Sequence, residues 1–149
     1  MQATARLASV VSSTLPAPRR PIRSVMPMKP IAERPLRHDE SEVIRWMLKH
    51  ASTRGTLDQL LSSVQNLRIV GAYECGCPSI DFVSQDETVG SAVIAEALCT
   101  SPEGVDAGLM IWAKEDAIVG FEAYNFGDVV PFSLPRVETL RPFPEHAKA

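Results

Sequence analysis

The sequence predicts an α+β fold in which two helices pack on a mainly antiparallel meander sheet of 4–5 strands, followed by a proline-rich coil. Three observations predict this class. Apolar residues recur with a period near 3.6 from residue 39 to 64, and with a period near 2 from residue 67 to 126. The connections between the later apolar runs are too short for parallel crossovers. The chain has 149 residues, 45% of them apolar, which suits a single domain.

Residues 1–35 differ from the rest of the chain in composition. They hold six of the 12 prolines, and six basic side chains against one acidic side chain. Because dense prolines interrupt helices and strand ladders, we expect a disordered extension at 1–34, a domain at 35–144 and a frayed tail at 145–149. Removal of residues 1–33 is then expected to leave the fold intact.

Three interpretations of the extension remain open. In the first, it is an inert tail. In the second, translation begins at Met26 or Met28, and the extension results from a start site placed upstream of the true one. In the third, residues 1–24 are a mitochondrial transit peptide, because they are rich in Arg and Ser and free of acidic residues. The first two interpretations go with a cytoplasmic protein.

The two predicted helices have recognisable starts. Asp39 and Glu42 have the spacing of a capping box, and Thr56 and Gln59 repeat it after Gly55. Each helix carries one apolar stripe, at Val43, Ile44, Met47, Leu48 and Ala51 in the first helix and at Leu57, Leu60, Leu61 and Val64 in the second. Both helices are therefore expected to pack one face on the core.

Five strands are predicted after Asn66, where β-branched and aromatic residues alternate with polar ones. Residues 109–112 are apolar on both faces, which indicates a central strand covered on both sides. Glycines at 71, 90, 108 and 120 indicate bulges or close packing. The expected strands are 67–75, 79–84, 91–98, 107–114 and 118–126, and the coil beyond them is expected to wrap back over the sheet.

The charge balance limits the classes of partner. Residues 36–149 hold nine basic and 17 acidic side chains, a balance of −8. Such a domain repels phosphate backbones, so we expect no nucleic-acid partner, and no apolar run reaches the roughly 20 residues that span a membrane. An acidic domain instead attracts a basic protein.

The three cysteines are the main chemical feature of the sequence. Cys75 and Cys77 flank Gly76 at a predicted turn, and with Cys99 they offer three thiolates to a soft cation such as zinc. The usual structural zinc pattern has two pairs, and here one is visible. The alternatives are a redox couple and, as the favoured interpretation, small strand residues kept reduced in a cytosol.

Catalytic interpretations rest on weaker patterns. Cys77 with His50 would need a third residue to orient the imidazole, and the sequence indicates none. Carboxylates at Glu74, Asp81, Glu96 and Glu122 fall on predicted strands, where two of them either share a site or, more simply, mark the solvated face. Tyr73, Trp112 and Tyr124 would line either a recognition surface or the core.

Three stretches carry a family resemblance. Residues 34–48, with Arg34, Leu36 and an acidic helix start, residues 75–82 and residues 118–124 resemble small uncharacterised bacterial α+β proteins, some of them similar to immunity proteins of toxin systems. The resemblance covers residues 34–126, and its motifs are those of packing, so it transfers no functional residue.

Two function hypotheses follow. The first is a non-enzymatic acidic module that binds another protein, for example a basic toxin. The second is a small metal protein or enzyme centred on Cys75 and Cys77. A flat acidic sheet face would favour the first, and polar side chains gathered in a concave pocket would favour the second.

Overall fold

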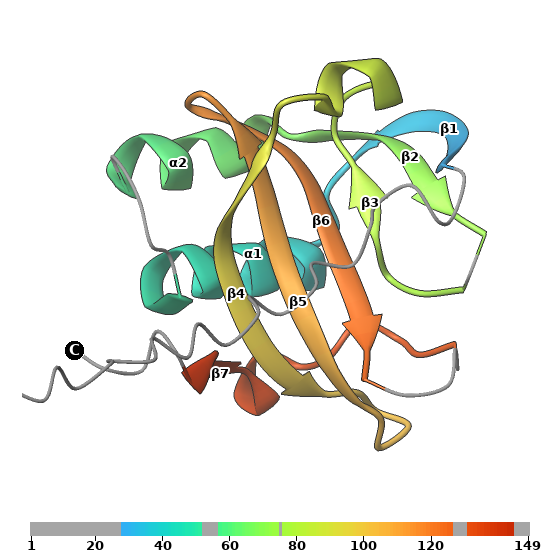
Figure 1. Ribbon diagram of the computed structural model, residues 1–149, viewed down its shortest axis with the longest axis vertical. Coiled ribbons are helices and arrows are strands. Elements are labelled where there is room, and N and C mark those ends of the chain that lie inside the picture. The colour runs from blue at the N-terminus through green and yellow to red at the C-terminus, as the bar shows by residue number, and fades with distance from the viewer. Residues whose placement is uncertain (1–27, 52–56, 75, 127–130, 145–149) are drawn as a thin grey trace, which may run out of the picture.

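The computed structural model describes residues 28–51, 57–74, 76–126 and 131–144. These residues form an α+β fold in which one antiparallel sheet of seven strands, in the order β1-β2-β3-β6-β5-β4-β7, packs with two helices (Figure 1). The predicted class is confirmed, but the sheet has more strands than expected. The two additional strands are β1 and β7, which lie at its two edges.

Helix α1, His38–Ala51, buries the predicted stripe completely. Val43, Ile44, Met47, Leu48 and Ala51 are all at most 2% exposed. The helix start differs from the predicted box, because it is Glu40 that accepts a hydrogen bond from the backbone N–H of Arg37, at 2.8 Å. The pairing therefore lies two residues before the predicted one, and Asp39 is already inside the first turn.

Helix α2, Leu57–Ser63, is short and continues into a 3₁₀ turn at Val64–Asn66. Leu60 and Val64 are buried, while Leu57 and Leu61 are partly buried against the same core. The predicted stripe is thus confirmed. Thr56, the expected cap, lies outside the described residues.

The five predicted strands are all present, four of them with small changes in length and one, predicted at 79–84, reduced to two residues. They are β2 at Arg68–Tyr73, β3 at Ile80–Asp81, β4 at Ala92–Thr100, β5 at Asp106–Lys114 and β6 at Ala117–Asn125. Strands β4, β5 and β6 form a meander joined by tight turns, as the short connections predict. Strand β3 is shorter than expected because a 3₁₀ turn follows at Gln85–Thr88.

Strand β1, Met28–Pro35, was not predicted. It pairs antiparallel with β2, with Met28 opposite Tyr73 and Pro35 opposite Arg68. The register of this pairing shifts at a bulge between Pro30 and Arg34. Prolines are tolerated here because β1 is an edge strand and needs no second ladder. The helices are therefore not N-terminal to the sheet, and the domain boundary expected at residue 35 is wrong for residues 28–34.

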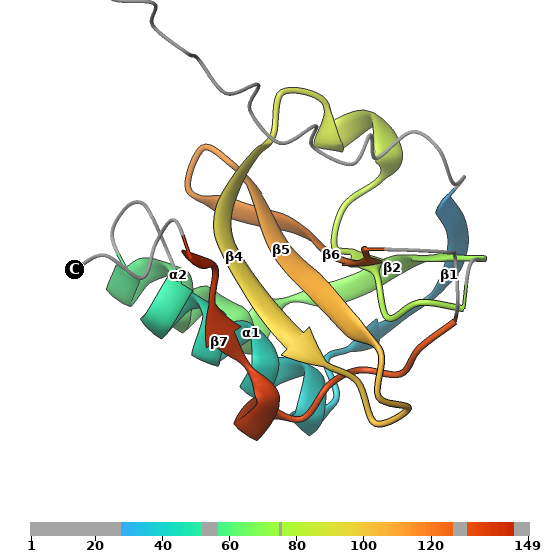
Figure 2. The same ribbon diagram turned by 60° about the horizontal axis from the view of Figure 1, so that its bottom comes forward.

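The C-terminal segment is less irregular than a coil. A 3₁₀ turn at Val137–Thr139 leads into β7, Arg141–Pro142, which pairs with Ala97 and Leu98 of β4. Phe132 and Leu140 are buried, as expected of a segment that wraps back over the core. Figure 2 shows β7 running alongside β4 at the edge of the sheet.

The sheet has a helix-covered inner face and an outer face. Both helices contribute to one large core together with Ile69, Leu109, Ile111 and Phe121 of the sheet. A second, smaller core on the outer face contains Met110, Trp112 and Val119. Strand β5 is covered on both sides, as its apolar sequence predicts.

Candidate functional site

The cysteine turn is built around Gly76, whose φ of 73° only glycine adopts readily. Cys77 is disulfide-bonded, so the expectation of a reduced cysteine is wrong at this position. Its Sγ lies 3.4 Å from Ser79 Oγ. Ser79 is buried, and its Oγ donates to Ala123 O at 3.2 Å and accepts from Ala123 N–H at 2.9 Å, so it fastens the turn to β6. Cys75 lies outside the described residues.

Cys99 lies apart from this turn, on the inner face of β4. It is a free thiol with 0% exposure, and its Sγ lies 3.6 Å from Ala107 O. Burial raises the pKa of Cys99 to about 11, which keeps the thiol protonated at neutral pH. Among the described residues, no group of three or more His, Cys, Asp or Glu side chains is placed to hold a metal ion.

His50 also takes a packing position. It lies at the end of α1, where its ring centroid is 4.7 Å from that of Trp46. The imidazole is exposed to solvent and stacks at a tilt on the indole ring. We find no described residue that orients it as a general base.

Three of the predicted carboxylates, at Asp81, Glu96 and Glu122, lie with the predicted aromatic residues on the outer face of the sheet, whereas Glu74 lies in the exposed turn after β2. On this face, residues of neighbouring strands lie directly opposite one another: Gly71 lies opposite Asp81, Asp81 opposite Gly120, and Gly120 opposite Trp112. In the next row Glu122 and Glu96 flank Met110 from its two neighbouring strands. Outer face here denotes Tyr73, Asp81, Val93, Glu96, Met110, Trp112, Glu122 and Tyr124.

Two hydrogen bonds join aromatic and acidic side chains on the outer face. Tyr73 O–H donates to Asp81 Oδ2 at 2.9 Å, and Trp112 Nε1–H donates to Glu122 Oε2 at 2.9 Å. Asp81 is 1% exposed, so the expectation that it marks a solvated face is wrong for this residue. Glu96 and Glu122 are half-buried.

Tyr124 lies across the same face. A Cβ added at Gly108 would collide with its ring, so the tyrosine depends on a glycine in the neighbouring strand. Burial, followed by the negative charges of Glu96 and Glu122, raises the pKa of Tyr124 to about 12. The phenol is therefore a neutral hydrogen-bonding group between two carboxylates. Phe126, 60% exposed, packs edge-on against it with centroids 5.5 Å apart.

A separate buried charge lies on the inner side, at the start of α1. Glu40 is 5% exposed, and Arg34 donates to both of its carboxylate oxygens at 2.9 Å. Burial acts to raise the pKa of Glu40, but the hydrogen bonds from Arg34 and from the Arg37 backbone outweigh it, and the pKa is lowered. This carboxylate is ionised and satisfied by its partners, which is a structural arrangement.

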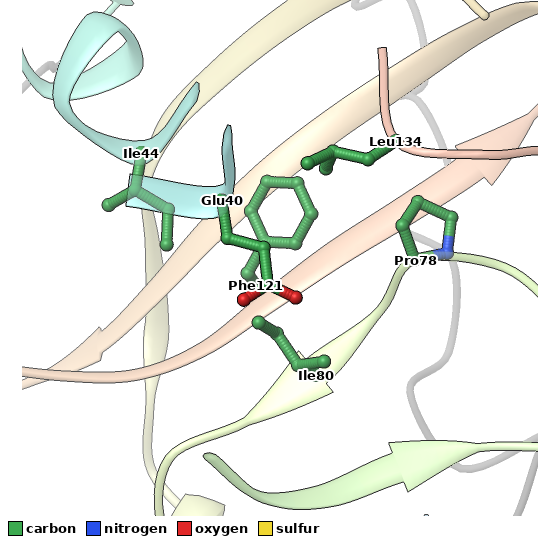
Figure 3. Close-up of a pocket in the computed structure, with 6 residues that line it drawn as sticks. All are labelled: Glu40, Ile44, Pro78, Ile80, Phe121 and Leu134. Atoms are coloured by element: carbon green, nitrogen blue, oxygen red, sulfur yellow. The ribbon is translucent and has the colours of Figure 1, made fainter. Parts of the chain in front are cut away.

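A small pocket adjoins Glu40. Figure 3 shows the Glu40 side chain extending beside the Phe121 ring toward Ile80, with Pro78 and Leu134 on the other side. The space between these side chains, about 170 Å³ with the open solvent included, leaves essentially no cavity for a ligand, whereas sites for drug-sized ligands enclose about 300 Å³ or more. The lining is apolar apart from Glu40, so the pocket lacks the convergent polar groups of an active site.

Comparison of the chain with models of known protein families, with curated proteins and with solved structures finds no match. The described helices include none long and apolar enough to cross a membrane.

The charge distribution adds a feature that the whole-chain balance conceals. Residues 69–135, which run from the second residue of β2 to the segment after β6, contain one basic side chain, Lys114, against eleven acidic ones. The other eight basic side chains that follow residue 35 lie before or after this range, and one of them, Arg68, is the first residue of β2. Four of the eleven acidic side chains lie on strands, at Asp81, Glu96, Asp106 and Glu122, so the acidic character belongs to these strands together with the segments that connect and follow them.

The sequence indicates which residues occupy the outer face but not how they pair. Alternation places Glu96, Glu122 and Tyr124 on one side of their strands, whereas the Trp112–Glu122 bond depends on the register between β5 and β6. A bulge between Trp112 and Ala113 shifts that register, and it lies opposite Gly120, one of the glycines at which the sequence predicts a bulge or close packing.

Proposed function

We propose that this protein is a non-enzymatic interaction module that binds a basic protein through acidic residues 69–135, which carry strands β3 to β6, most of β2, and their connections. The observation that supports the proposal is the charge balance of −10 in residues 69–135, where Lys114 alone opposes eleven acidic side chains. A surface of one sign steers an oppositely charged partner and speeds association.

The outer face adds the groups that recognise arginine and lysine. Carboxylates accept hydrogen bonds from guanidinium and ammonium groups, and the outer face carries two half-buried ones, Glu96 and Glu122. Tyr124 and the exposed Phe126 present ring surfaces on which an arginine stacks. Together these groups favour a cationic protein surface over a small molecule.

Some of the small bacterial proteins that the sequence resembles are similar to immunity proteins, which fits the same class of partner. A basic toxin would supply the charge that complements residues 69–135. The proposal concerns the chemistry of the partner and does not depend on that identity.

Affinity capture with the full chain as bait tests the proposal. Two variants lose equal charge, E96Q/E122Q on the outer face and D58N/E138Q on the exposed surface of α2 and of the C-terminal segment. We expect wild type and D58N/E138Q to retain, at low salt, a partner with an excess of lysine and arginine, and E96Q/E122Q to lose it. Retention by E96Q/E122Q at the wild-type level, or capture unaffected by 500 mM salt, would contradict the proposal.

A further inference from the structure

We propose that the arginine-rich segment preceding Met28 binds the outer face of its own sheet, and thereby competes with the basic partner. The competition rests on the proposed function, whereas the intramolecular contact stands independently of it. The occupant is residues 1–27 of the same chain.

Charge complementarity is the first argument. Residues 1–27 contain Arg6, Arg19, Arg20 and Arg23 and no acidic residue. Residues 69–135, which supply Glu96 and Glu122 on the outer face, have a balance of −10. Arginine binds carboxylates in a planar, two-pronged geometry and also stacks on aromatic rings, and the outer face offers both groups.

The position at which the segment joins the fold is the second argument. Met28, the first residue of β1, packs its side chain over Gly71, where a Cβ would collide with Met28 Sδ. Gly71 belongs to the register row that continues through Asp81 to Trp112 on the outer face. The preceding chain therefore enters the domain beside this face, next to the Tyr73–Asp81 pair.

The reach of the segment is the third argument. In the strand order β1-β2-β3-β6-β5-β4, Glu122 on β6 lies three strands from β1 and Glu96 on β4 lies five. At about 4.8 Å per strand these are distances of roughly 14 and 24 Å. An extended chain covers about 3.3 Å per residue, so Arg23, five residues before Met28, reaches roughly 16 Å, and Arg19 reaches roughly 30 Å. The arginines match the span of the carboxylates.

The indole groups of the two tryptophans provide a probe for the proposed contact. The chain contains two tryptophans, Trp46 on α1 and Trp112 on the outer face. The Trp112 indole N–H is bonded to Glu122, so an arginine that approaches this carboxylate changes its environment. Trp46 packs against the inner core and serves as an internal control.

The first experiment compares three full-length chains labelled with ¹⁵N: wild type, R19Q/R20Q/R23Q and R19K/R20K/R23K. We expect the indole signal of Trp112 to shift in the glutamine variant and to stay near its wild-type position in the lysine variant, with that of Trp46 unchanged in both. A Trp112 signal that is the same in all three chains would overturn the proposal. Equal shifts of both indole signals would also overturn it, because they indicate a general change of fold.

Zero-length cross-linking locates the contact. A carbodiimide joins an amine to a carboxylate, so the lysines of R19K/R20K/R23K form amide bonds with the acidic residues that they touch. We expect, in the monomer fraction, cross-linked peptides that contain Glu96 or Glu122, lost in the E96Q/E122Q background and kept in the D58N/E138Q background. Cross-links confined to dimers, or to acidic residues on the helices, would overturn the intramolecular contact.

A hexa-arginine peptide then tests the competition. We expect R19Q/R20Q/R23Q to bind this peptide roughly tenfold more tightly than wild type, since three surface ion pairs are removed from the competing segment. Equal affinities would overturn the competition. Cross-links to Glu96 or Glu122 without peptide binding by any chain would support the intramolecular contact and contradict the proposed function.

Discussion

The buried carboxylate of Glu40 holds the start of helix α1 against strand β1. Its carboxylate accepts two hydrogen bonds from Arg34 on β1 and one from the Arg37 backbone. The same residue thus caps α1 and ties it to the edge strand. A buried acid with this set of donors is stabilising only while it is ionised.

We predict that Glu40→Gln lowers the free energy of unfolding by about 1–3 kcal/mol at pH 7, because charged hydrogen bonds are lost from a buried site. The folded-state pKa of Glu40 is lowered, so its contribution is present above its unfolded-state pKa and is lost as pH falls through the folded-state value. Urea unfolding between about pH 7 and pH 3 should therefore show a smaller decline for the variant than for wild type. Glu42→Gln, at an exposed position of the same helix, is the control.

Gly108 is a second residue whose substitution is expected to lower the free energy of unfolding. We predict that Gly108→Ala costs about 1–3 kcal/mol in unfolding free energy, because the added Cβ collides with the ring of Tyr124. The same change in a Tyr124→Ala background should cost less, since the ring is absent. Equal costs in the two backgrounds, measured by urea unfolding, would show that the strand and not the ring resists the substitution.

At the scale of elements, α2 tests whether a two-turn helix is held by packing. We predict that Leu60→Ala costs about 2–5 kcal/mol, because Leu60 is 6% exposed and contacts the main core. Leu61→Ala should cost less, since Leu61 is half-buried. Ser62→Ala is the control, as its exposed hydroxyl donates only to the Asp58 carbonyl of the same helix. Small, equal losses in chemical unfolding at all three positions would contradict a docked helix.

The elements also show what the sequence determines locally. Period and turn chemistry predicted both helices and the strands β2 to β6, because each of these carries its own amphipathic pattern. The sequence did not predict strands β1 and β7, because Pro30, Pro35 and Pro142 argue against strands. These two segments form strands because they pair with β2 and β4. The capping residue was misplaced by two positions because Arg34, outside the helix, recruits Glu40.

The sequence predicts which residues form the candidate site, but it does not predict which of them bond to one another. Alternation identified Glu96, Glu122 and Tyr124, but the burial of Asp81 depends on its bond to Tyr73 in another strand. The concentration of acidic residues between residues 69 and 135 is visible in the sequence, but their division between strands and connections is clear only once the strand boundaries are known. Pairing across strands is a property of the register, which composition does not specify.

At the scale of the whole molecule, the new edge strand changes the expected effect of truncation. We predict that removal of residues 1–27 lowers the free energy of unfolding by no more than about 1.5 kcal/mol, because β1 is retained and only the surface ion pairs proposed for the segment are lost. Removal of residues 1–33 should cost about 2 kcal/mol or more, since it deletes most of β1 together with Ile31, which packs on the core, and the Glu33–Arg68 ion pair. Thermal and urea unfolding of both truncated chains measure the difference. Equal stabilities would show that β1 contributes little to the domain.

The pairing of β7 with β4 has a consequence for the order of events during synthesis. Strands β4, β5 and β6 follow one another closely, so this meander can form as soon as residue 125 has left the ribosome. The outer edge of β4 then stays open until Arg141 and Pro142 arrive to cover Ala97 and Leu98. An uncovered edge recruits strands from other chains. A pause in translation between residues 125 and 141 would therefore prolong the interval in which nascent chains on one polysome can join edge to edge.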